Sequence, residues 1–212
     1  MRIKICCISS PDEAQLAAEA GADLLGLVGP MPSGPGILDH EMAADISRTA
    51  PASAQPILLT SSHTAADIIA DAERVGVTHV QVVRHLDPVE AKRLAATSLT
   101  YFQVIHIENE GALDLIDIYA PFCDAYLLDS GKPSLNTLGG TGNTHDWSIS
   151  AQFVARAPKP TYLAGGLRPD NVAKAIHHVR PDGVDICSGI RKDARLDPTL
   201  LRDFVDAARS TL

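Results

Sequence analysis

Residues 160–189 read PTYLAGGLRPDNVAKAIHHVRPDGVDICSG. The segment holds two short apolar runs, 160–164 and 183–187, separated by the helical stretch 169–178. Two strands joined through a helix lie parallel in one sheet, because the helix returns the chain to the edge where the first strand began. The segment therefore predicts two strands of a parallel sheet with a helix packed on one face.

The same strand and helix pattern recurs along the whole chain, and we count eight units. Gly21 and Gly76 lie just past two helical stretches, where a glycine commonly ends a helix, and a strand follows at once. An open doubly wound sheet could be built from such units but seldom holds eight regular ones. The pattern predicts a single (β/α)₈ TIM barrel of the α/β class that spans residues 1–212. The predicted strands are 2–7, 23–28, 56–60, 78–83, 99–105, 123–129, 160–164 and 183–187, and the predicted helices are 10–20, 39–49, 63–74, 87–97, 110–117, 148–155, 169–178 and 198–210.

The composition limits the partners that the protein can have. With 212 residues and 45% hydrophobic side chains, the chain can fill the core of one barrel. A net charge of −8 argues against nucleic acid, since binding phosphates along a strand needs clustered Lys and Arg. No run approaches the roughly 18 apolar residues of a membrane span, and the first ten residues are too mixed for a signal peptide. We therefore expect a cytoplasmic protein with no nucleic-acid or membrane partner, either a monomer or a homodimer.

The four cysteines lack the CxxC spacing of a metal site, and each lies in an apolar, strand-like run. Such positions are typical of small buried side chains. The histidines show no ligand spacing with carboxylates either. We expect neither a metal site nor a disulfide scaffold. The cysteines are Cys6, Cys7, Cys123 and Cys187.

Glycines gather after the last three predicted strands. Gly139 to Gly142 follow the sixth strand, Gly165 and Gly166 the seventh, and Ser188 and Gly189 the eighth. Glycine lets backbone N–H groups approach a phosphate closely, and barrels of this class hold phosphates beside strands seven and eight. One such pair alone would indicate a hinge or a tight turn. Three in succession predict a phosphorylated small molecule as the ligand.

Two side chains at predicted strand ends are candidates for catalysis. Lys4 and Cys6 are two residues apart in the first strand, so they share a face, and Cys7 points to the other face, where we expect it to pack against helices. A neighbouring ammonium favours the thiolate form of Cys6. Asp129 ends the sixth strand, and a long loop follows it instead of a helix that it could cap. In an eight-stranded barrel these two strands lie well apart, so Cys6 and Asp129 would flank a ligand as base and acid.

With these residues in place, the chain resembles the phosphoribosylanthranilate isomerase family. The pieces that match follow the family order along nearly the whole chain, and the glycine loop that leads to Asp146 and Trp147 is the most specific of them. They are Lys4-Ile5-Cys6, Glu19 to Asp23, Leu127-Leu128-Asp129, Gly139 to Gly142 with Thr144, Asp146 and Trp147, Leu163 to Leu167 with Pro169, Asn171 and Val172, and Gly183 to Asp185 with Ser188 and Gly189.

The resemblance implies an Amadori rearrangement of a phosphoribosylated amine, without a cofactor. In that reaction Asp129 would be the general acid that opens the ribose ring, and Cys6 the general base that takes the proton from C2. Lys4 would assist Cys6, and the family's glutamine at strand four would be Gln81. The phosphate would be held by three loops, which comprise Gly140, Thr141 and Gly142, then Gly165 and Gly166, then Asp185, Ser188 and Gly189.

The chain departs from the family pattern on the face that would carry the active site. The family's arginine for the anthranilate carboxylate is Gly36, its glycine after the catalytic cysteine is Cys7, and its histidine-glycine pair at strand four is Val83 and Arg84. Arg84 could supply the missing cation, since a guanidinium grips a carboxylate through two N–H groups. Two alternatives remain, namely a paralogue that isomerises a different phosphorylated sugar or aminosugar, and a non-catalytic protein that binds a phosphorylated ligand.

Overall fold

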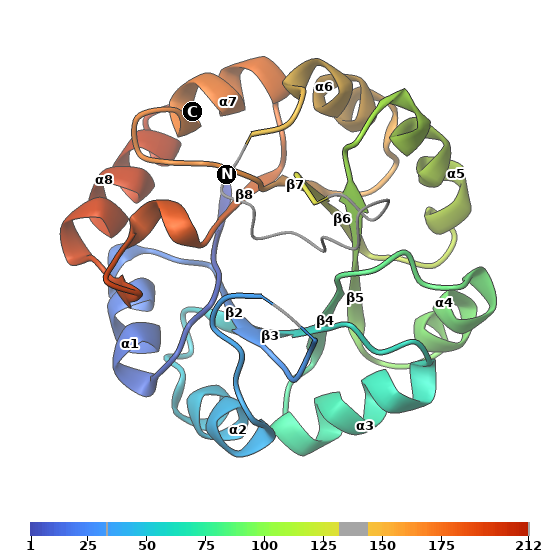
Figure 1. The fold of residues 1–212 in the computed structure, drawn as a ribbon, viewed down its shortest axis with the longest axis horizontal. Helices are drawn as coiled ribbons and strands as arrows, with labels where there is room; N and C mark the ends of the chain where they lie inside the picture. The colour runs from blue at the N-terminus through green and yellow to red at the C-terminus, as the bar shows by residue number, and fades with distance from the viewer. Residues whose placement is uncertain (33, 132–143, 212) are drawn as a thin grey trace.

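The computed structural model describes residues 1–32, 34–131 and 144–211. In these ranges the chain forms a closed barrel whose eight parallel strands follow the order of the sequence, with helices around the outside (Figure 1). The strands are β1 (Arg2–Ile5), β2 (Leu24–Val28), β3 (Gln55–Thr60), β4 (His79–Val82), β5 (Thr100–His106), β6 (Ala125–Asp129), β7 (Thr161–Leu163) and β8 (Gly183–Ile186).

Each strand after β1 is reached through a helix on the outer face of the sheet (Figure 1). The helices are α1 (Pro11–Ala20), α2 (His40–Thr49), α3 (Ala65–Val75), α4 (Pro88–Ala95), α5 (Leu115–Tyr119), α6 (Trp147–Arg156), α7 (Val172–Val179) and α8 (Pro198–Arg209), and a 3₁₀ turn, η1 (Glu110–Asp114), precedes α5. The predicted elements are recovered, with ends that differ by a few residues. The prediction missed a small hairpin, β9 (Arg191–Lys192) and β10 (Arg195–Leu196), between β8 and α8.

Pairing between the first and last strands closes the barrel. Lys4 lies opposite Asp185 and Ile5 opposite Ile186, in parallel register. The closed barrel is therefore confirmed over the open sheet. Closure brings the two ends of the chain together, so residues near position 6 contact residues near position 187.

The apolar side chains divide between two layers, as the alternation along each strand requires. One cluster fills the barrel interior and includes Phe102, Val104 and Leu127. A larger cluster lies between strands and helices and includes Val80, Val82 and Leu128. Because all eight strands run parallel, their carboxyl ends open on one face, where the catalytic groups of such barrels lie. Among the described residues, no helix is long and apolar enough to cross a membrane.

Candidate active site

Lys4 lies at the centre of a buried polar cluster inside the barrel. Its ammonium Nζ is 2.9 Å from Oδ1 of Asp185 on the neighbouring strand, and the two side chains are 0% and 9% exposed. Although burial disfavours the charged form, Asp185 and Cys6 together raise the pKa of Lys4, so it stays protonated. The structure therefore places Asp185 in strand β8, inside the barrel, and not in the loop that follows.

Cys6 shares the inner face with Lys4, as the two-residue spacing predicted. The positive charge of the Lys4 ammonium favours the thiolate form of Cys6. Burial nevertheless has the largest effect and raises the pKa of the thiol to about 11. The ammonium thus favours the thiolate, as predicted, but desolvation of the sulfur outweighs this effect in the unliganded protein.

Gly26 leaves space for the side chains of Cys6 and Lys4, and it is not among the site residues predicted from the sequence. A Cβ atom at this position would lie 2.9 Å from Sγ of Cys6 and 3.0 Å from Nζ of Lys4. Strand β2 reads LLGLV, and a lone glycine inside an apolar strand indicates a close approach by another group. This glycine within an apolar strand was therefore the sequence feature from which the role of Gly26 could have been predicted.

Asp129 ends β6, across the barrel from β1. Its Oδ1 accepts a hydrogen bond of 2.7 Å from the backbone N–H of Ser130. Burial raises the pKa of the carboxyl above its ordinary value, against the effects of Ser130 and of the positive charge on Lys4. Lys4 and Asp185 both interact electrostatically with Asp129. The predicted acid and base thus belong to one coupled cluster.

The last two glycine loops meet on the same face of the barrel. Gly165 and Gly166 follow β7, both with positive φ, and Ser188 and Gly189 follow β8. Gly189 packs against the backbone carbonyl of Leu167, so the two loops are in direct contact. The third predicted loop, with Gly140, Thr141 and Gly142, lies outside the described residues.

Gln81 and Arg84 lie on and just after β4. The side chain of Gln81 is 3% exposed, on the face opposite to Val80 and Val82, and its Oε1 atom has no hydrogen-bond partner in the part of the chain that the structure describes. Arg84 reaches across to the end of β3, where Nε donates to the carbonyl of Ser61 at 2.5 Å and Nη1 lies 3.1 Å from Nδ1 of His63. Both therefore lie toward the open end of the barrel, and Arg84 is anchored beside it.

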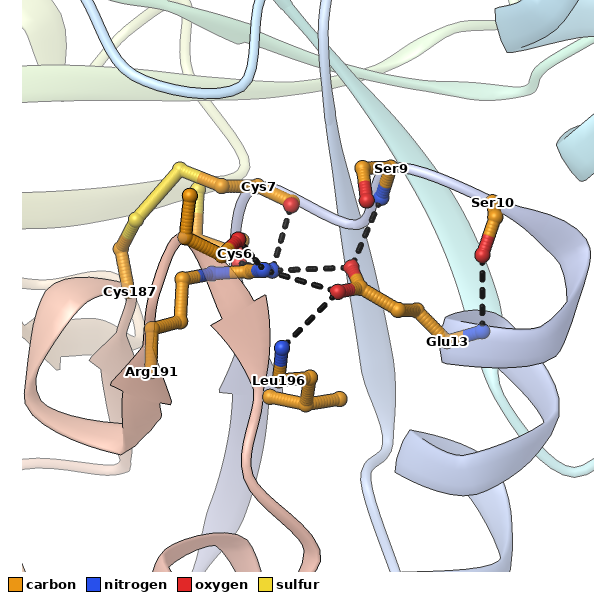
Figure 2. Close-up of polar contacts among 9 residues, drawn as sticks. Cys6, Cys7, Ser9, Ser10, Glu13, Cys187, Arg191 and Leu196 are labelled. Carbon is orange, nitrogen blue, oxygen red and sulfur yellow. Dashed lines mark hydrogen bonds and ion pairs between the residues drawn. A yellow bond between two sulfur atoms is a disulfide. The ribbon is translucent and has the colours of Figure 1, made fainter.

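Cys7 differs most from its predicted role. It lies past the end of β1 with φ of 62°, belongs to the inner cluster, and forms a disulfide with Cys187 (Figure 2). The predictions that Cys7 packs against the helices and that Cys7 and Cys187 are simply small buried side chains are wrong. The reason is closure, since β1 pairs with β8 and brings the two Cα atoms to 5.9 Å despite a separation of 180 residues.

Gly36, which stands where the family has an arginine, lies directly against Cys7. Its φ is +70°, and a Cβ atom would be 2.8 Å from the Cβ atom of Cys7. Two departures from the family pattern are therefore in contact with each other. Because Cys7 is tied to Cys187, position 36 has no space for a side chain unless this turn moves.

Comparison with known proteins identifies the family. The family model described as N-(5′-phosphoribosyl)anthranilate (PRA) isomerase matches residues 3–207. N-(5′-phosphoribosyl)anthranilate isomerase 2 of Methanosarcina mazei is 34% identical over 99% of this chain and 95% of that protein. The isomerase of Geotalea daltonii is 36% identical over 100% of this chain and 98% of that protein.

Solved structures agree with this assignment. The phosphoribosyl anthranilate isomerase of Thermotoga maritima superposes with a TM-score of 0.87 at 27% identity, over 99% of both chains. An isomerase bound to reduced 1-(o-carboxyphenylamino)-1-deoxyribulose 5-phosphate superposes with a TM-score of 0.84 at 26% identity, again over 99% of both chains. The resemblance seen in the sequence is confirmed, and the chain belongs to the N-(5′-phosphoribosyl)anthranilate isomerase family.

Proposed function

We propose that this protein converts N-(5′-phosphoribosyl)anthranilate to 1-(o-carboxyphenylamino)-1-deoxyribulose 5-phosphate, a step of tryptophan biosynthesis. The observation that carries the proposal is the coupled cluster of Lys4, Cys6 and Asp129 at the open end of the barrel. Membership of the family and the ligand of one superposed isomerase support the substrate. The reaction moves hydrogen within one molecule, so it needs an acid and a base but no external oxidant.

Asp129 is the proposed general acid. Its proton passes to the ribose ring oxygen, the bond between that oxygen and C1′ breaks, and the nitrogen lone pair forms an iminium bond to C1′. A carboxyl whose pKa is raised by burial holds its proton nearer to neutral pH than an exposed one does. The burial of Asp129 therefore suits it to protonate a weakly basic oxygen.

Cys6 is the proposed general base. Its thiolate takes the proton from C2′, and the electron pair left behind forms a C1′–C2′ double bond and neutralises the iminium nitrogen. The resulting enol then takes a proton at C1′, loses its hydroxyl proton and becomes the ketone. The free thiol must first release its proton to solvent, and two positive charges favour that loss, namely the Lys4 ammonium and the iminium group formed by ring opening.

The two contacting glycine loops are the proposed phosphate site. Gly165 and Gly166 after β7 and Ser188 and Gly189 after β8 lie side by side at the end of the barrel that carries Cys6. Backbone N–H groups there can surround an anion without interference from side chains. The contribution of Gly140, Thr141 and Gly142 remains a prediction, as does the cytoplasmic location.

Arg84 is the proposed partner of the anthranilate carboxylate. No side chain fits at position 36 while Cys7 occupies its present place, so the cation must come from another strand end. Arg84 presents a guanidinium beside the mouth of the barrel, held by Ser61 and His63. The same crowding at Gly36 favours a second candidate, a phosphoribosylated amine without the aromatic acid.

One fluorescence assay tests these roles, because phosphoribosylanthranilate fluoresces and its loss reports turnover. We expect Cys6→Ser and Asp129→Asn to lower kcat by about 10²- to 10⁴-fold, the usual contribution of a positioned acid or base. Unchanged turnover in both variants would refute the mechanism. A wild-type protein that fails to consume this substrate would favour the second candidate.

The carboxylate role of Arg84 needs its own variant. Arg84→Met should raise KM by about tenfold or more, since the loss of a charge-assisted hydrogen bond costs about 1.5–3 kcal/mol. Arg48→Met, which removes an exposed arginine of α2 that pairs with Asp45, is the matched control. Equal KM values in the two variants would remove Arg84 from the site.

A further inference from the structure

Arg191 extends from the hairpin after β8 to the turn that follows the catalytic strand β1. Figure 2 shows its guanidinium against the backbone of Cys6 and Cys7. Its Nη2 atom donates to the carbonyl of Cys7 at 2.5 Å and lies 3.4 Å from the carbonyl of Cys6. Arg191 is therefore bonded to the backbone carbonyls of the proposed base and of the residue that follows it.

Glu13 of α1 holds this guanidinium in place. The two groups form a bidentate pair, with Nη1 to Oε1 at 2.9 Å and Nη2 to Oε2 at 3.1 Å, and the side chains are only 10% and 13% exposed. Although burial opposes ionisation, the hydrogen bonds from Arg191 and from the backbone N–H of Leu196 lower the pKa of Glu13. Glu13 also accepts from the backbone N–H of Ser9 at 3.0 Å, so it joins the turn, the hairpin and α1.

The peptide between Cys6 and Cys7 links this pair to the sulfur. Its carbonyl oxygen lies 3.4 Å from Nη2 of Arg191, and its plane includes the Cα atom that carries the Cys6 side chain. The six atoms of a trans peptide are coplanar, so a group that holds the oxygen also restricts the Cα atom of Cys6 and the side chain attached to it. Cys7 needs this support, because φ of 62° is a conformation that residues with side chains rarely adopt.

We propose that Arg191, anchored by Glu13, is a positioning residue that fixes the backbone of Cys6 and Cys7 and so holds the sulfur of the catalytic base in place. This inference rests on the proposed role of Cys6. Arg191 touches no reacting atom and acts through the peptide that it holds. The position of the sulfur affects its charge, because the Lys4 ammonium beside it favours the thiolate.

A competing explanation is that Arg191 only stabilises the hairpin, where its Nη1 also donates to the carbonyl of Ala194 at 3.1 Å. The two explanations differ in what they predict for Cys6. Stabilisation of the hairpin alone would change the melting temperature and leave the reactivity of the sulfur unaltered. Positioning requires both turnover and thiol reactivity to change.

The test combines kinetics with alkylation of Cys6 by iodoacetamide, followed by peptide mass spectrometry. For Arg191→Met we expect kcat to fall about tenfold or more with KM within about threefold. We expect Cys6 to be alkylated about tenfold more slowly at pH 8, because a sulfur that moves away from the Lys4 ammonium has a higher pKa and a smaller thiolate fraction. Arg191→Lys should recover part of both losses. Arg48→Met on exposed α2 should match wild type.

Glu13→Gln provides a second test if Arg191→Met does not fold. It keeps the size of the side chain but removes the charge that anchors the guanidinium, and it should change kcat and alkylation in the same direction by a smaller factor. Wild-type kcat and alkylation rates in folded variants of both residues, or faster alkylation, would overturn the proposal. Because alkylation does not require turnover, a failure of Cys6 as the base would be seen separately, as an active Cys6→Ser variant.

Discussion

Substituting Lys4 by methionine should destabilise the protein strongly. The ammonium pairs with Asp185 at 2.9 Å, and neither side chain has appreciable contact with solvent. Removing one partner of a buried ion pair leaves the other charge uncompensated, at a cost of about 3–5 kcal/mol. The exposed pair of Arg48 and Asp45 offers the contrast, since such surface pairs contribute about 0–1 kcal/mol. Arg48→Met is therefore the matched control.

The pH dependence of this loss follows from Asp185. Burial raises the pKa of its carboxyl, and Lys4 opposes that rise, so without Lys4 the folded-state pKa rises further. Below the folded-state pKa of Asp185 in wild type, the carboxyl is protonated in both folded proteins and the substitution costs little. Above it the folded wild type ionises and the folded variant does not, so the deficit grows by about 1.4 kcal/mol per pH unit until the higher folded-state pKa of the variant is reached. A deficit of about 3–5 kcal/mol would thus develop over about two to four pH units.

Urea unfolding followed by circular dichroism, at acidic and at neutral pH, measures this deficit. The double variant Lys4→Met/Asp185→Leu should recover most of the stability, since replacement of a buried pair by apolar groups is often neutral or stabilising. A loss below about 1 kcal/mol at neutral pH would refute the reasoning, because that is the range of a surface pair. A double variant no more stable than the single one would also contradict it.

Two further predictions concern the thiols and the acid. Reduction of the Cys7–Cys187 disulfide should lower the free energy of unfolding by up to about 5 kcal/mol, because the bond closes a loop of 180 residues. A Cys7→Ala/Cys187→Ala variant should not respond to dithiothreitol. Mass spectrometry of untreated wild type should find two free thiols, Cys6 and Cys123, and four free thiols would contradict the bond. A plot of kcat/KM against pH should be level between the raised pKa of Asp129 and the Cys6 pKa of about 11. On this plateau the thiolate fraction of Cys6 rises tenfold per pH unit while the protonated fraction of Asp129 falls tenfold, so their product is constant. The value of kcat/KM therefore declines only below the lower pKa and above the higher one. A peak confined to about one pH unit near neutrality would exclude Cys6 and Asp129 as the base and acid.

Local patterns in the sequence were sufficient for the barrel and for much of the site. Alternating apolar runs and helical stretches predicted the strands and helices, because side-chain periodicity is a property of each element by itself. The spacing of Lys4 and Cys6 placed them on one face for the same reason. Asp129, at the end of an apolar strand, could be assigned to the open end of the barrel. Even Gly26 had a local signal in its strand.

Contacts between residues near β1 and residues near β8, where the barrel closes, were decided by the tertiary structure alone. Lys4 and Asp185 are 181 residues apart, Cys7 and Cys187 are 180 apart, and Glu13 and Arg191 are 178 apart. No periodicity connects such positions, because only the pairing of β1 with β8 brings them together. The protonation state of Cys6 could not be predicted from the sequence either, because the sequence shows the neighbouring lysine but not the burial that outweighs its effect. The sequence thus determined which chemical groups line the open end of the barrel, and closure of the barrel determined their partners and their protonation.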